Sequence, residues 1–128
     1  MKEKNFVKEN YIEKLWMDEK NLKKINSMGH ILGLHSYYHP TLMENKSYKD
    51  QEIEYIKNLD HLEKILGKNQ IYSMAHPCGS YNEDTLKILN KLNIKIGFKS
   101  DMNKKLNSSN LEIPREDHKH ILMMLENV

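Results

Sequence analysis

Apolar residues recur every three or four positions in three stretches of the chain, residues 18–28, 47–66 and 82–93. This spacing places them on one face of a helix, so each stretch is predicted to be an amphipathic helix. Asp18 and Asn82 are suitable N-caps for the first and third helices, and a glycine directly follows the second. The apolar positions are Leu22, Ile25, Met28, Ile53, Ile56, Leu59, Leu62, Ile65, Leu66, Leu86, Leu89 and Leu92.

Short apolar runs with the length of strands alternate with these helices. They read HILGLHS, QIYSMAH and IKIGF, and the first is apolar enough to be buried on both faces. Alternating helices and strands with short connections predict an α/β fold with a parallel sheet. Residues 100–110 are expected to form a polar loop or edge, and residues 118–128 a short helix.

Side chains suited to chemistry follow the first two of these runs. His35 and His39 come after the first run, and the segment His76 to Gly79 comes after the second. In parallel α/β folds, functional sites collect at the carboxyl ends of the strands. Two neighbouring strands would therefore present both segments on one rim.

The spacing of His35 and His39 has two interpretations. Two histidines four residues apart lie on one side of a helix or sharp turn, where neutral imidazoles bind zinc and similar divalent ions. The alternative is a pair of polar residues at the end of a strand, because this spacing is common by chance.

The second segment also leaves alternatives open. Its turn could offer main-chain N–H groups to a developing oxyanion, and Cys78 is either a nucleophile or a buried or spectator thiol. His76 is more often structural than catalytic at such a position. Arg115 either orients an acidic partner or lies on the surface, while His118 and His120 are expected to be solvated.

Length and composition fit one globular domain of 128 residues, 38% hydrophobic and 30% charged. The charges are interleaved and the net charge is +2, which gives no indication of nucleic-acid binding. A single cysteine excludes an internal disulfide. The first residues lack the apolar core of a signal peptide, and no run approaches a membrane span, so we expect a cytoplasmic protein without a membrane partner.

Taken together, three segments resemble one known family. The stretch MGHILGLHSYYHPTL resembles the metal-binding motif of the polysaccharide deacetylases, the NodB-homology or family-four carbohydrate esterases. MAHPCGSYNEDTLKILNKLNIKIGF resembles their next motif, and LEIPRED is similar to the Pro-Arg ending of one branch. The resemblance runs from about Asp18 to Arg115 in the expected order.

The resemblance implies a distorted (β/α) barrel and a metal-dependent hydrolase that removes acetyl groups from N-acetylated carbohydrates. By that analogy His35 and His39 bind zinc or another divalent metal, and Ser36 supports their loop. The main-chain N–H of Cys78 helps to hold the oxyanion, and Arg115 replaces the arginine that the turn lacks. Contacts with the sugar are expected from His76, Pro77, Gly79 and Tyr81.

Two parts of the family pattern are not matched in this sequence. The Asp-Asp motif, which supplies the catalytic base and the third metal ligand, is absent, and a later catalytic histidine is not recognisable. We therefore interpret residues 1–128 as a single partial deacetylase domain, which is expected to self-associate because a partial barrel leaves a sheet edge uncovered. The alternative is a non-catalytic remnant or interaction module with weak metal or glycan binding.

Overall fold

The computed structural model describes residues 15–102, 109–116 and 118–126. The chain divides into two compact units, residues 1–30 and 31–128. Helix α2 (Glu19–Ser27) lies in the described part of the first unit. The Asp18 side chain caps it by accepting a hydrogen bond of 2.8 Å from the main-chain N–H of Asn21, which confirms the predicted start.

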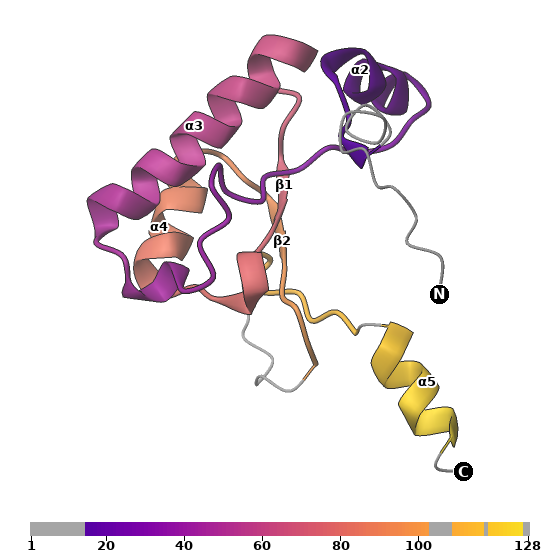
Figure 1. Cartoon of the computed structure of the whole chain (residues 1–128). Coiled ribbons are helices and arrows are strands. Elements are labelled where there is room, and N and C mark those ends of the chain that lie inside the picture. The colour runs from indigo at the N-terminus through magenta and orange to yellow at the C-terminus, as the bar shows by residue number, and fades with distance from the viewer. Residues whose placement is uncertain (1–14, 103–108, 117, 127–128) are drawn as a thin grey trace, which may run out of the picture. The chain divides into compact units, whose positions relative to one another are not determined.

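A small parallel sheet organises the second unit. Strand β1 (Ser73–Ala75) pairs in parallel with β2 (Ile96–Phe98), with Met74 opposite Gly97. Single parallel bridges extend the sheet on both sides, from Leu34 to Met74 and from Phe98 to Ile113. Figure 1 shows α3 (Tyr48–Leu66) and α4 (Glu83–Lys91) together on one side of these strands, as the predicted α/β fold requires.

The strand predicted for HILGLHS is wrong in its extent. Leu34 alone forms a bridge, and the side chain of Ile31 is 62% exposed, so this segment is not buried on both faces. Gly33 lies against Ser73, where a Cβ atom would approach the serine Oγ to 2.6 Å. The two strands and two bridges of the described residues are a parallel sheet, and they do not amount to a barrel.

Helix α3 begins and ends where the sequence predicts, and four of its six predicted core positions are confirmed, because Leu62 and Ile65 are buried and Leu59 and Leu66 pack against the core. Ser47 caps its start and Gly67, with φ of 100°, ends it. Ile53 and Ile56, predicted to face the core, are about two-fifths exposed, whereas polar Gln51 and Glu54 are buried. Polar side chains hold these positions because they bind neighbouring segments, as described below.

Helix α4 carries a complete capping box. The Asn82 side chain accepts from the Thr85 N–H at 3.1 Å, and the Thr85 hydroxyl accepts from the Asn82 N–H. Ile88 and Leu89 of α4 are fully buried in the core that α3 and the strands share. The other core residues are Leu34, Met43, Tyr55, Leu62, Ile71, Met74, Ile94 and Leu111.

Three further elements complete the described part of the chain. Two are 3-10 turns, η1 (Met43–Asn45) and η2 (Pro77–Gly79), and the third is α5 (His118–Glu126), which confirms the predicted terminal helix. Most of the polar segment 100–110 lies outside the described residues. Among the described helices, none combines the length and the apolar character needed to cross a bilayer.

Candidate active site

The two histidines of the first motif lie in a tight loop directly after Leu34. Ser36 and His39 adopt left-handed backbone conformations, with φ of 59° and 54°. The buried Ser36 hydroxyl accepts a hydrogen bond of 3.1 Å from the main-chain N–H of His39. The loop therefore turns back on itself, and Ser36 has the supporting position that the family resemblance implies.

Two polar side chains of helix α3 hold this loop in place. The side-chain amide oxygen of Asn58 accepts a hydrogen bond from the main-chain N–H of His35 at 2.9 Å. One carboxylate oxygen of Glu54 accepts from the N–H groups of Tyr37 at 3.1 Å and Tyr38 at 2.8 Å. Sequence patterning missed Glu54 and Asn58, because polar residues on a helix are ordinarily assigned to its solvent face.

The imidazole rings of His35 and His39 lie side by side. Their centroids are 4.8 Å apart with an angle of 60° between the ring planes, and both side chains are exposed. His35 Nδ1 lies 2.8 Å from the Ala75 carbonyl oxygen. Because a carbonyl only accepts hydrogen bonds, Nδ1 carries a proton, so in the neutral tautomer that fits this contact the lone pair is on Nε2.

This arrangement suits metal coordination at His35, since ligating histidines commonly donate their other ring N–H to a carbonyl or carboxylate. The two rings fit as two ligands of a divalent ion such as zinc. Among residues 15–102, 109–116 and 118–126, no three His, Cys, Asp or Glu side chains are grouped so that they would hold a metal ion. Within the described residues, the histidine pair is therefore not joined by a third side chain of these types.

The second motif forms the turn η2 at the carboxyl end of β1. Cys78 at its centre has a left-handed backbone, φ 52° and ψ 15°, and its side chain is exposed, so the thiol is not buried, while the nucleophile and spectator interpretations both stay open. The N–H groups of Gly79 and Ser80 are bonded within the turn, to the carbonyls of His76 and Pro77. In the described part of the chain, no such bond involves the Cys78 N–H.

The flanks of this turn are tied to the segment that follows the 103–108 region. The ring of His76, which is 1% exposed, has its Nε2 atom 2.8 Å from the Leu111 carbonyl oxygen. The Tyr81 ring stacks on the His76 ring at 4.2 Å, and its hydroxyl donates to Glu112 at 2.9 Å. Burial, together with the Glu112 carboxylate, raises the pKa of Tyr81, so its hydroxyl is protonated at neutral pH.

The opposite side of the turn contacts the segment that follows the histidine loop. The Ser80 hydroxyl accepts from the main-chain N–H of Glu44 at 3.1 Å, and the Asn82 side-chain amide donates to the Glu44 carbonyl at 2.9 Å. Together with the contact between His35 and Ala75, these bonds place the two motifs on one rim, as the sequence predicts.

The remaining predicted site residues differ in accessibility. His76, Pro77 and Gly79 are buried and shape the turn, whereas Tyr81 is partly exposed at its flank. Arg115 is exposed, two residues after the bridge at Ile113. His118 and His120 are exposed on α5, as expected.

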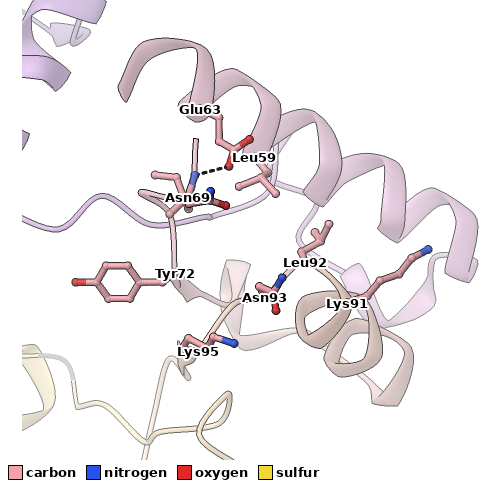
Figure 2. A pocket seen from close by; sticks show the side chains of 9 residues that line it. Leu59, Glu63, Asn69, Tyr72, Lys91, Leu92, Asn93 and Lys95 are labelled. Carbon is pink, nitrogen blue, oxygen red and sulfur yellow. Dashed lines mark hydrogen bonds between the residues drawn. The ribbon is translucent and has the colours of Figure 1, made fainter. Parts of the chain in front are cut away.

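A pocket lies at the opposite end of the strands. Figure 2 shows this pocket, of about 430 Å³, between α3, the end of α4 and the residues that precede β1 and β2. Leu59, Ile71 and Leu92 contribute its apolar part, and Tyr72 and Lys95 lie at its rim. The pocket is separate from the candidate site. Its residues precede β1 and β2, whereas the side chains of the two motifs follow Leu34 and β1 at the other end of the strands.

Comparison with known proteins shows which family the sequence belongs to. The family model described as polysaccharide deacetylase matches residues 1–97. A search of curated proteins finds no match.

Solved structures of deacetylases share the fold. The deacetylase PplD of Streptococcus pyogenes in complex with acetate matches with 26% identity and a TM-score of 0.69, over 84% of this chain and 50% of PplD. The deacetylase domain of BpsB from Bordetella bronchiseptica matches with 16% identity and a TM-score of 0.65, over 79% of this chain and 48% of that one. The present chain therefore spans about half the length of these two structures.

A third match is to BA3943 of Bacillus anthracis, described as a pseudoenzyme of the CE4 family. Its identity is 22% and its TM-score 0.54, over 59% of this chain and 26% of BA3943. At such low identity, the matches to BpsB and BA3943 show a common fold alone.

Proposed function

Because this chain belongs to the polysaccharide deacetylase family, we propose that it acts in the hydrolysis of acetamido groups on an N-acetylated sugar or polysaccharide. The observation that carries this proposal is the shared rim of the two motifs. Two adjacent imidazoles follow the bridge at Leu34, and β1 is followed by a left-handed turn in which the Cys78 N–H has no main-chain acceptor among the described residues. Such a rim supplies ligands for a Lewis acid beside a donor for an oxyanion.

His35 and His39 are the residues proposed to hold a divalent metal ion, with zinc the expected metal. The proton on His35 Nδ1, fixed by the Ala75 carbonyl, leaves Nε2 as the coordinating atom. A bound ion of this kind polarises an amide carbonyl and lowers the pKa of a coordinated water. Glu54 and Asn58 contribute by keeping the histidine loop rigid before the ion arrives.

The turn is proposed to act on the developing negative charge. The main-chain N–H of Cys78 donates to the oxyanion, and the left-handed backbone at Cys78 fixes the direction in which this group points. Arg115 is proposed to act electrostatically at the same rim. Tyr81 is the residue of the turn best exposed for contact with the sugar, and His76, Pro77 and Gly79 shape the surface beneath it.

A non-catalytic role is the second candidate, because the described residues offer two metal ligands and the sequence has no Asp-Asp motif. Such a protein would keep the scaffold and bind metal or glycan weakly. General acid–base groups contribute about 10²–10⁴-fold to rates, so a rim without the carboxylate would turn over slowly.

Zinc titration by calorimetry, followed by an acetate-release assay on chitin oligosaccharides and peptidoglycan, tests the proposal. The double variant His35→Ala, His39→Ala is expected to lose zinc binding and acetate release together. His30→Ala, which removes an exposed histidine that precedes the loop, is the matched control and should retain both. Zinc binding without acetate release would favour the non-catalytic candidate, and binding unchanged in the double variant would refute the assigned ligands.

A further inference from the structure

Two side chains that flank the turn η2 contact one and the same segment. His76 precedes the turn and reaches the Leu111 carbonyl with its ring, while Tyr81 follows the turn and donates to the Glu112 carboxylate. The rings of His76 and Tyr81 also stack on each other, with 23° between their planes. The turn is thus attached on both flanks to residues 111 and 112.

That segment is itself fixed to β2. The Ile113 N–H donates to the Gly97 carbonyl at 2.8 Å, and the Lys99 N–H donates to the Ile113 carbonyl at 2.9 Å. Gly97 lies so close to the Leu111 main chain that a Cβ atom would overlap with the Leu111 carbonyl group. Arg115 follows two residues after Ile113, so its main chain is carried by the same attachment.

We propose that Tyr81 and Glu112 are positioning residues, a hydroxyl–carboxylate pair that locks the turn η2 to the segment 111–113 and so holds the Cys78 N–H and Arg115 in a fixed relation. This role rests on the function proposed above, in which both groups act on the reacting amide. Neither Tyr81 nor Glu112 needs to touch the reacting atoms for it.

The energetics of the turn explain why such a pair is needed. A non-glycine residue in the left-handed region costs free energy and persists only where its surroundings over-determine it, and Cys78 is such a residue. Gly79 next to it packs against Ser100, where a Cβ atom would overlap with the serine hydroxyl. The bond from Tyr81 to Glu112 is charge-assisted and partly buried, the kind that contributes most to rigidity.

The pair is largely shielded from water on the Glu112 side. Glu112 is 4% exposed, and its carboxylate accepts the hydrogen bond that the Tyr81 hydroxyl donates. Asp101 adds negative charge near the same hydroxyl. Loss of the hydroxyl would remove one donor from a buried carboxylate while leaving the stacked ring in place.

The test uses the full chain and four variants, of which Glu112→Ala removes the carboxylate altogether. Tyr81→Phe removes the hydroxyl and keeps the ring, Glu112→Gln keeps an acceptor and removes the charge, and Tyr72→Phe is the control at an exposed tyrosine near the other end of β1. Amide hydrogen exchange by NMR reads the Gly79 and Ser80 N–H groups, which are bonded within the turn. Kinetic constants for acetate release are measured beside it.

Tyr81→Phe is expected to speed exchange at Gly79 and Ser80 about tenfold while protected amides of α3, such as that of Leu62, keep their rates. In the acetate assay it should lower kcat about tenfold with little change in KM, because a displaced donor weakens transition-state binding most. Glu112→Ala should show the same two changes, and Glu112→Gln should show much smaller ones, because its amide oxygen still accepts the hydrogen bond from Tyr81.

Unchanged exchange at Gly79 and Ser80 in Tyr81→Phe would overturn the proposal, and so would an equal increase throughout the chain, which indicates general destabilisation. A different outcome is that neither the natural chain nor any variant releases acetate, while Tyr81→Phe still speeds exchange at Gly79 and Ser80. In that case the proposed function fails, but the attachment of the turn to segment 111–113 stands.

Discussion

Strained residues gather at the two motifs. Among the described non-glycine residues, five have positive φ values, and three of them, Ser36, His39 and Cys78, belong to the histidine loop or the turn. The other two are asparagines, Asn93 directly after the C-cap of α4 and Asn69 in the turn that follows α3, and asparagine adopts this conformation at little cost. Unfavourable backbone conformations at the candidate site indicate that geometry there is maintained by specific contacts rather than by local preference.

Glu54 is the residue on which the histidine loop depends most directly. Glu54→Ala would leave the N–H groups of Tyr37 and Tyr38 without their acceptor, so the loop should lose its fixed shape. We expect zinc affinity to fall about 10–100-fold, as it does when groups that orient metal ligands are removed. Calorimetric titration measures this, with Glu54→Gln as the control because its amide oxygen still accepts. Equal affinity in Glu54→Ala and the natural chain would contradict the role.

Tyr55 presents a different case, a fully buried hydroxyl. No described residue makes a hydrogen bond to it, and burial, followed by the nearby Glu54 charge, raises its pKa above the usual value near 10. An unsatisfied buried polar group costs about 1–3 kcal/mol, so Tyr55→Phe should raise the free energy of unfolding, by about 1 kcal/mol.

The raised pKa of Tyr55 also predicts a pH effect. A group with a higher pKa in the folded state contributes fully below the unfolded value and loses that contribution as pH rises past it. The natural chain should therefore lose stability above about pH 10, and Tyr55→Phe should lose less. Urea unfolding at neutral and alkaline pH measures both effects. A large loss of stability in Tyr55→Phe at neutral pH would show that the hydroxyl has a partner.

At the level of elements, α3 connects the site to the rest of the second unit. Its polar residues hold the histidine loop on one side, and on another side Gln51 accepts from the buried Thr85 hydroxyl of α4 at 2.5 Å. Gln51 also donates to the Lys46 carbonyl. A helix that binds a loop, a neighbouring helix and the core at once transmits changes between them, because none of these contacts is free to shift alone.

Thr85→Val tests the connection between α3 and α4. Valine has nearly the same shape but leaves the buried Gln51 carbonyl without its donor and removes part of the α4 capping box. The free energy of unfolding is expected to fall by about 1–3 kcal/mol. Thr85→Ser, which keeps the hydroxyl, should lose clearly less in the same urea titration. Equal losses in the two variants would mean that the methyl group, and not the hydrogen bonds, matters.

For the whole molecule, the small sheet and the exposed apolar residues favour association with another surface. Two strands of three residues with single bridges on each side are marginal by themselves. Helix α5 has five consecutive apolar residues, Ile121 to Leu125, each about half exposed or more. Monomeric proteins rarely leave such a contiguous patch in water.

We therefore expect the purified chain to self-associate in a concentration-dependent way. Sedimentation velocity at increasing protein concentration measures this, and the double change Leu122→Glu, Leu125→Glu on α5 should weaken association at least about tenfold by placing charges in the apolar patch. Ile53→Glu on α3 is the control at an exposed apolar residue outside the patch. A compact monomer at all concentrations would contradict the expectation.

Local patterning was sufficient to predict the helices and the place of the motifs, but not the extent of the first strand. Apolar spacing located α2, α3 and α4, and the caps Asp18 and Asn82 were identified from residue type, because these features depend on neighbours within a few positions. The order of strands and helices likewise placed His35, His39 and Cys78 after strand ends. The family resemblance of the motifs follows from the sequence in the same way, and the family model agrees.

Only the tertiary structure decided what holds these residues. The acceptors for the histidine loop, Glu54 and Asn58, lie up to 23 positions away, and the partner of Tyr81 lies 31 positions away. The burial of His76 and the short extent of the first strand are likewise decided by packing between distant segments. Periodicity reports which face of a helix is apolar, but it carries no information about which polar side chain meets a loop folded back from elsewhere in the chain.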